Sequence, residues 1–136
     1  MNQVRERYYR SIFLISSVYD IVLGIIFMFF YEFTFEFLGI PEKLPSFGGY
    51  ISLIGAFLLV IGVGYYFIYR GDLQRNYDLI KIGALYKFAY CLIVFYYFFF
   101  NSIPHIIFVS LFGVIDLIFF VLMLECVAFL KANYRR

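Results

Sequence analysis

Four long stretches of apolar residues, separated by short polar segments, dominate the hydropathy pattern of this 136-residue chain. The stretches cover about 12–31, 50–69, 79–100 and 103–130, and each has at least the roughly 20 residues that a helix needs to cross a bilayer. Their boundaries carry glycine, proline, asparagine and serine, which end helices. The pattern predicts an all-α fold, a transmembrane four-helix bundle in which residues 1–136 form a single domain.

The composition supports a membrane environment. Hydrophobic residues make up 65% of the chain and charged residues 15%, whereas a soluble domain has about 45–50% apolar and about 25% charged residues. Most side chains must therefore face lipid, and the lipid bilayer is the expected partner. Other membrane subunits or a second copy of the chain are further candidates. The formal net charge of +2 gives no reason to expect a nucleic-acid partner.

The distribution of basic residues predicts the orientation. Three regions carry lysine and arginine: the N-terminal segment, the turn after the second span with the helix start that follows it, and the C-terminal tail. The segment 32–49 has only Lys43. By the positive-inside rule, both termini lie in the cytoplasm, in a bacterial-type inner membrane. The residues counted for the cytoplasmic side are Arg5, Arg7, Arg10, Arg70, Arg75, Lys81, Lys131, Arg135 and Arg136.

The N-terminal segment 1–10 resembles the start of a signal peptide. However, the apolar run that follows it is too long for a signal sequence and lacks a small-residue cleavage site, which indicates a retained first span. The segment 32–49 contains Phe33, Phe35 and Phe37, too many apolar residues for a solvated linker. We expect residues 33–38 to lie at the outer membrane interface, so that polar replacements of Phe35 and Phe37 would loosen this loop and leave the spans inserted.

Three predicted spans each contain one charged residue deep in the apolar run: Asp20, Lys87 and Asp116. Such groups are costly in hydrocarbon unless they face the bundle interior and find partners. Asp20 and Lys87 each lie about 12 Å from the cytoplasmic edge and Asp116 about 13–14 Å, at about 1.5 Å per residue. Because the depths agree, the three groups are predicted to touch or to share one polar cavity.

Other residues are expected to support this cluster. The hydroxyl groups of Tyr19, Tyr86 and Tyr90 are placed to add hydrogen bonds to the charged groups. Glycines along the spans allow neighbouring helix backbones to approach closely. The glycines assigned to helix packing are Gly24, Gly55, Gly62, Gly83 and Gly113.

No catalytic residue, metal ligand or cofactor follows from the motifs. His105 is the only histidine and has no cysteine or second histidine nearby, which makes a metal site a poor interpretation. Gly62-Val63-Gly64 lies inside an apolar helix without a preceding strand, so it is not a dinucleotide-binding fingerprint. The two cysteines, Cys91 and Cys126, lie in predicted spans and indicate no disulfide framework.

The charged cluster has two interpretations. In the first, Lys87 lies between two carboxylates and the ion pairs orient the bundle. In the second, the cluster is a proton or ion relay or a polar binding pocket. Two aspartates and one lysine carry a formal charge of −1, which favours protonation of one aspartate or the binding of a cation.

Short motifs in all four spans resemble the DoxX-like superfamily of small four-helix membrane proteins. They are Tyr19-Asp20, Gly62-x-Gly64-Tyr65-Tyr66, Gly83-x-x-x-Lys87 and Ile115-Asp116-Leu117. The resemblance covers about residues 12–125 and implies the four-helix fold. The founding members are membrane subunits associated with thiosulfate:quinone oxidation. Their early Gly-x-x-Lys feature is absent here, so the resemblance implies no catalytic residues.

The leading hypothesis is a non-enzymatic integral membrane protein that acts as an accessory or structural subunit. The first alternative is a small-solute or proton-coupled transporter that uses Asp20, Lys87 and Asp116. The second is a quinone-linked membrane redox subunit, for which the sequence shows no cofactor ligand. A solvent-filled cavity at the three charged groups would favour transport, whereas a dry cluster would favour the subunit.

Overall fold

Four long helices build the computed structural model, which describes residues 2–134. They are α1 (Gln3–Phe29), α3 (Gly49–Arg70), α4 (Tyr77–Phe100) and α6 (Ile115–Tyr134). The short helix α5 (Ile106–Phe108) and the π-helical segment η2 (Val109–Val114) lead directly into α6. By length and composition, α1, α3, α4 and the continuous stretch Ile106–Tyr134 are each apolar and long enough to cross a membrane. The predicted all-α fold with four candidate spans is confirmed for the described residues.

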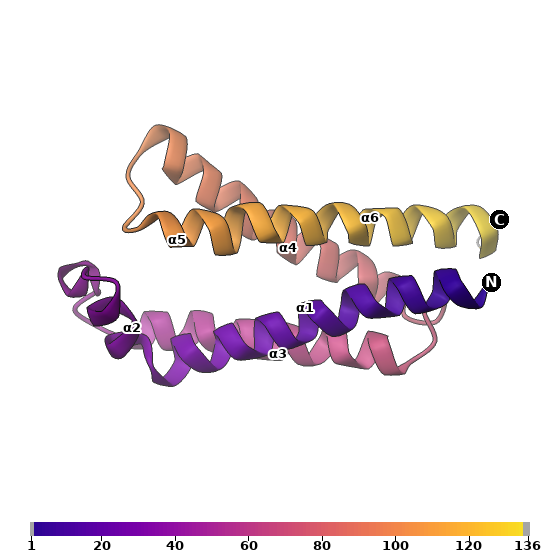
Figure 1. The fold of residues 1–136 in the computed structure, drawn as a ribbon, viewed down its shortest axis with the longest axis horizontal. Coiled ribbons are helices and arrows are strands. Elements are labelled where there is room, and N and C mark those ends of the chain that lie inside the picture. The colour runs from indigo at the N-terminus through magenta and orange to yellow at the C-terminus, as the bar shows by residue number, and fades with distance from the viewer. Residues whose placement is uncertain (1, 135–136) are drawn as a thin grey trace.

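The long helices form two pairs that lie side by side (Figure 1). Helix α1 packs along α3, and α6 packs against α4, which runs obliquely across the bundle. The N- and C-termini lie at one end, called here the terminal end, together with the 71–76 connection. The helices α2 (Tyr31–Phe37) and η1 (Pro41–Lys43) lie at the opposite end, called the α2 end.

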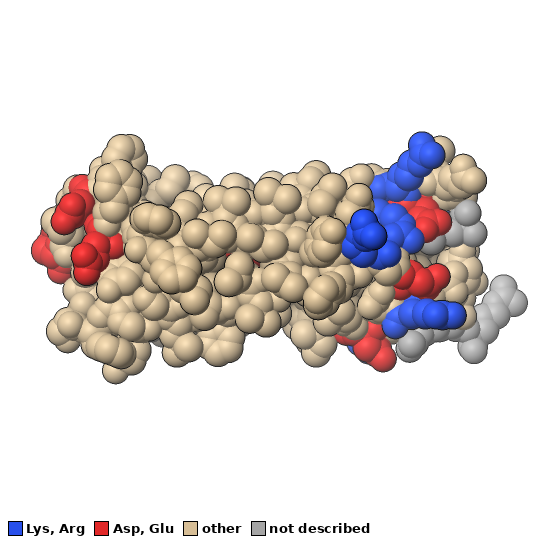
Figure 2. Space-filling view, turned by 90° about the horizontal axis from the view of Figure 1, so that it is seen from below, with Lys and Arg blue, Asp and Glu red and all other residues tan. Residues whose placement is uncertain are grey.

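Charged side chains are confined to the two ends of the surface seen in Figure 2, and a broad uncharged band separates them. Asp and Glu side chains gather at the α2 end, while Lys and Arg side chains appear at the terminal end together with acidic ones. This is the surface that a four-span membrane protein presents, because the hydrocarbon core of a bilayer excludes exposed charge. Arg135 and Arg136, which contribute to the predicted orientation, lie outside the described residues.

Helix α1 begins nine residues before the predicted span, at Gln3. The side chain of Asn2 accepts a hydrogen bond from the backbone N–H of Val4 at 3.0 Å and so caps the helix. One turn further on, the guanidinium of Arg10 pairs with Glu6 at 2.8 Å. The basic N-terminal segment is therefore part of the first helix.

A contact between the first and last long helices holds this extension in the bundle. The hydroxyls of Tyr8 and Tyr9 donate to the carboxylate of Glu125 on α6, at 3.2 and 3.3 Å. Tyr9 is fully buried. Glu125 thus joins the two helix pairs at the terminal end.

The last span also begins at a different residue, Ile106 instead of 103. His105 is its N-cap residue, and Nδ1 of His105 accepts a hydrogen bond from the backbone N–H of Ile107 at 3.1 Å. Pro104 lies directly before the N-cap residue. At this position the missing backbone N–H of proline costs the helix no hydrogen bond, and the proline ring keeps the preceding residue out of the helical conformation. His105 is consequently a helix-end residue.

The phenylalanines of α2 have two different environments, which the sequence pattern did not reveal. Phe35 is buried, and its ring centroid lies 5.8 Å from that of Phe108. Phe33 and Phe37 stack on each other and are exposed. The difference follows from helical geometry, because two residues two positions apart are separated by about 200° around the helix axis and so lie on opposite faces.

Glycines bring the backbones of α1 and α3 into direct contact. A Cβ atom added to Gly24 would lie 2.7 Å from the backbone nitrogen of Leu59 and 2.8 Å from the carbonyl oxygen of Gly55. Gly62 likewise faces the α1 backbone, at Ile21 and Ser17. The other two glycines assigned to helix packing face aromatic rings, Gly83 that of Tyr65 and Gly113 that of Phe95.

Candidate functional site

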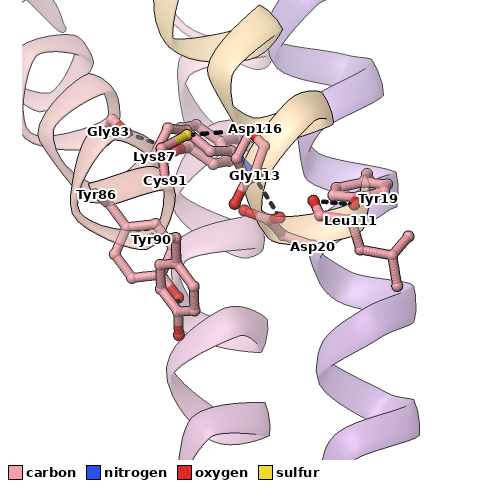
Figure 3. A network of polar contacts seen from close by, with 11 residues as sticks. Tyr19, Asp20, Gly83, Tyr86, Lys87, Tyr90, Cys91, Leu111, Gly113 and Asp116 are labelled. Atoms are coloured by element: carbon pink, nitrogen blue, oxygen red, sulfur yellow. Dashed lines mark hydrogen bonds and ion pairs between the residues drawn. The ribbon is translucent and has the colours of Figure 1, made fainter. Parts of the chain in front are cut away.

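An ion-pair cluster of Asp20, Lys87 and Asp116 lies in the interior of the bundle (Figure 3). The ammonium nitrogen of Lys87 lies 2.7 Å from Oδ1 of Asp20 and 3.0 Å from Oδ1 of Asp116. The side chains are at most 1% exposed. The cluster predicted from equal depths is present.

The cluster connects the two helix pairs. Asp20 belongs to α1, Lys87 to α4, and Asp116 to the first turn of α6. It separates two apolar parts of the core, one rich in residues from the terminal end and one rich in residues from the α2 end. Because charged hydrogen bonds are directional and strong in a dry environment, the cluster restricts how the helix pairs can slide past each other.

Asp116 follows a π-helical segment that the sequence did not reveal. In η2 the backbone N–H of Ile115 bonds to the carbonyl of Ser110, five residues earlier. This widened turn shifts the rotational position of the residues after it relative to an unbroken α-helix. Two of its carbonyls accept bonds from other helices: Leu111 from the hydroxyl of Tyr19 at 2.6 Å, and Gly113 from the thiol of Cys91 at 3.3 Å.

Three aromatic rings surround the ammonium group of Lys87. The ring centroids of Tyr19, Tyr65 and Phe119 lie 5.3, 5.5 and 5.2 Å from Nζ. The negative faces of aromatic rings attract a cation at such distances. The ammonium group is therefore stabilised by the three rings as well as by the two carboxylates.

Tyr65 and Phe119 were not among the predicted site residues. The spacing of Phe119, three residues after Asp116, was a usable signal because both lie on one helix face. Tyr65 also donates a hydrogen bond from its hydroxyl to the carbonyl of Gly83 at 2.7 Å, one turn before Lys87. It thereby ties α3 to α4 directly beside the cluster.

The hydroxyl groups of Tyr19, Tyr86 and Tyr90 were expected to bond to the charged groups, but within residues 2–134 they bond to other partners. The hydroxyl of Tyr19 donates to Leu111, so Tyr19 contributes its ring and not a hydrogen bond to an aspartate. The hydroxyl of Tyr86 donates to that of Tyr90 at 3.2 Å. In Figure 3 these two side chains lie side by side, next to the cluster. Their hydroxyl groups face each other because the residues are four apart on one helix.

Two buried polar atoms of α1 have no hydrogen-bond partner among the described residues: Oδ2 of Asp20 and Oγ of Ser16. They belong to residues four apart, which share one face of the helix. The cluster also holds two carboxyl groups for one ammonium group. An unpaired carboxylate oxygen in an apolar interior is costly, so this part of the cluster is suited to hold a proton.

Two cavities among the described residues lie away from the cluster. One, of about 490 Å³, lies between the helix pairs toward the α2 end, and the other, of about 420 Å³, lies among Asp72, Gln74, Arg75, Tyr77, Leu130 and Tyr134 at the terminal end. Neither is lined by Asp20, Lys87 or Asp116. Among residues 2–134, no group of three histidine, cysteine, aspartate or glutamate residues is arranged to hold a metal ion.

Fold and site together define the class of the molecule: a small membrane protein with four apolar helices and a buried Asp–Lys–Asp cluster. Compared with protein-family models, with curated proteins and with solved structures, the chain shows no match.

Proposed function

We propose that the protein is a non-enzymatic integral membrane protein that acts as an accessory or structural subunit, with the ion-pair cluster holding its two helix pairs in one arrangement. The observation that carries this proposal is the complete burial of Lys87 between carboxylates from two other helices. A buried polar contact of this kind specifies packing more than it adds stability. A cluster that neither of the two cavities reaches fits a structural role better than a solute pathway.

We also propose that both termini face the cytoplasm, in a bacterial-type inner membrane. The support is the basic residues at the terminal end, which include Arg5, Arg7 and Arg10, against Lys43 at the α2 end. By the positive-inside rule the more basic end stays in the cytoplasm. The partners of such a subunit are lipid and other membrane proteins, or a second copy of the chain.

The proposed relation to the DoxX-like superfamily concerns the fold. Its support is the short motifs in the four spans, which converge at one place in this structure. Lys87 pairs with Asp20 and Asp116, and Tyr65 bonds to the carbonyl of Gly83. Residues from all four spans thus meet at the cluster.

A second candidate function is proton-coupled transport. It is favoured by the surplus carboxyl group of the cluster and by the unpartnered Oδ2 of Asp20. A carboxyl group that gains and loses a proton is the chemistry that proton relays within membranes use. For transport, a path for water or solute would have to open to the cluster during a conformational change.

One experiment separates the two functions. The full-length protein is reconstituted into vesicles containing a pH-sensitive dye, and a potassium diffusion potential is imposed with valinomycin. A structural subunit gives the same proton flux as protein-free vesicles, and Asp116→Asn leaves it unchanged. A flux that the wild type shows and Asp116→Asn loses would overturn the structural proposal in favour of transport.

A second measurement addresses the subunit role. In mild detergent extracts, we expect the protein to migrate in an assembly larger than its 16.2 kDa monomer. Lys87→Met should weaken that assembly, because it loosens the arrangement of the helix pairs that the partner contacts. Migration of the wild type as a monomer alone would contradict the proposal.

A further inference from the structure

The larger cavity runs from the lipid-facing surface into the core. At its mouth, Ile54 of α3 is 43% exposed and Ile93 of α4 is 56% exposed. At its inner wall, Phe27, Ile51 and Phe112 are at most 8% exposed. The mouth lies between α3 and α4, which diverge toward the α2 end (Figure 1).

The walls of the cavity are apolar. The lining contains no charged residue, and its side chains are aliphatic or aromatic hydrocarbon except for the hydroxyl groups of Tyr90, Tyr97 and Ser102. The volume of about 490 Å³ lies in the range of small-molecule binding sites, roughly 300–1,000 Å³. The residues at its opening, Ile54 and Ile93, are apolar and exposed, so the opening faces the hydrocarbon of the membrane.

Physical chemistry restricts what fills this space. An empty cavity destabilises a protein in proportion to its volume. Water enters a cavity when it finds two to four polar partners. The polar side-chain groups of this lining are the hydroxyls of Tyr90, Tyr97 and Ser102, and that of Tyr90 is already bonded to Tyr86. Hydrocarbon matches both the walls and the surrounding medium. We propose that an acyl chain of a membrane phospholipid enters between α3 and α4 and occupies the cavity.

The position of the cavity also assigns the leaflet. Ile103 and Pro104, in the connection at the α2 end, form part of its lining. A chain that reaches Phe27 and Phe112 from this side belongs to a phospholipid of the leaflet at the α2 end. The bound chain packs between the α1/α3 and α4/α6 pairs, in the part of their interface toward the α2 end. The residues of the ion-pair cluster do not line this part. This inference depends on the membrane-spanning fold and does not depend on the proposed subunit function.

The test uses the full-length protein in vesicles of phosphatidylcholine that carries a photoreactive diazirine at the end of one acyl chain. After illumination, the cross-linked residues are identified by mass spectrometry. A lipid that only surrounds the bundle reaches exposed residues such as Leu92. A chain in the cavity also labels the inner wall, at Phe27, Ile51 or Phe112. Labelling confined to exposed residues would overturn the proposal.

A matched pair of variants links the labelling to the cavity. Val94 lines the cavity and is half-buried, so Val94→Phe fills part of the space and should reduce inner-wall labelling several-fold. Val60, 67% exposed on α3, does not line the cavity, and Val60→Phe should leave inner-wall labelling unchanged.

A second filling variant keeps the test decisive if Val94→Phe does not fold. Ala89 also lines the cavity but is exposed, so Ala89→Phe is easier to accommodate. The helical circular dichroism spectrum and the thermal midpoint establish that each variant is folded. Inner-wall labelling that persists at the wild-type level in a folded filling variant would exclude occupation of this cavity by a lipid chain.

Discussion

The ammonium nitrogen of Lys87 lies 2.7 Å from Oδ1 of Asp20, although 67 positions separate the two residues in the chain. The contact joins α4 to α1, which belong to different helix pairs. Both side chains are fully buried. The relationship therefore reports directly on whether the helix pairs are correctly docked.

Replacing the central lysine should destabilise the bundle strongly. Lys87→Met leaves two carboxyl groups buried without a cation, and breaking a buried pair in this way costs about 3–5 kcal/mol. Asp20→Asn should cost less, since Asp116 remains to pair with Lys87. Thermal denaturation in detergent measures both effects. Equal destabilisation by the two variants would contradict the surplus of one acid.

The double variant Lys87→Met with Asp116→Asn tests coupling within the cluster. It should recover part of the stability lost in Lys87→Met, because it removes one of the stranded acids together with the lysine. Residues in contact show such coupling, typically about 0.5–3 kcal/mol, whereas independent sites are additive. Strict additivity of the two single changes would mean that Lys87 and Asp116 do not interact.

The contact between α1 and α3 predicts a sharp difference between two glycines of α3. A Cβ atom at Gly55 would lie 2.5 Å from the backbone nitrogen of Met28, so Gly55→Ala forces the helices apart at a cost of about 1–3 kcal/mol. Gly64 has nothing within 4 Å of the corresponding position. Gly64→Ala should be neutral or stabilising by up to about 1 kcal/mol, since alanine favours helix.

The thermal midpoints of the two glycine variants, measured in the same detergent, check this difference. If Gly55→Ala unfolds at the temperature of Gly64→Ala, the close approach of the two backbones is not present in the membrane protein.

The two phenylalanines of α2 should respond differently to truncation. Phe35 packs against Phe108 in the core, so Phe35→Ala should cost about 3 kcal/mol. Phe37 is 80% exposed, and Phe37→Ala should change the stability by less than about 0.5 kcal/mol. Limited proteolysis of the protein in membranes provides the measurement. Faster cleavage of residues 30–48 is expected for Phe35→Ala, with Phe37→Ala as its control.

The orientation in the membrane can be tested with single cysteines. Ser46 and Asn133 are both exposed, at the α2 end and at the terminal end. In a background without Cys91 and Cys126, a membrane-impermeant thiol reagent added outside intact cells should label Ser46→Cys. It should label Asn133→Cys after the membrane is opened. Labelling of both from the same side would refute the four-span topology.

The sequence by itself determined the four helical spans and the identities of the three charged cluster residues. Hydropathy is a local property that can be read along the chain, and a charge in an apolar run requires a partner wherever the helices dock. The depth of each charged residue in the membrane follows from the constant rise per residue of a helix. Because the depths of Asp20, Lys87 and Asp116 agree, the sequence predicted that these side chains meet.

Only the tertiary structure decided the surroundings of that cluster. The π-helical turn before Asp116, the rings of Tyr65 and Phe119, and the partners of the tyrosine hydroxyls depend on how each helix is rotated against its neighbours. The burial of Phe35 and the cavity between α3 and α4 have the same origin. Rotation and crossing angle arise from side chains of several helices packing at once, and an apolar surface that faces lipid in one rotation faces the core in another.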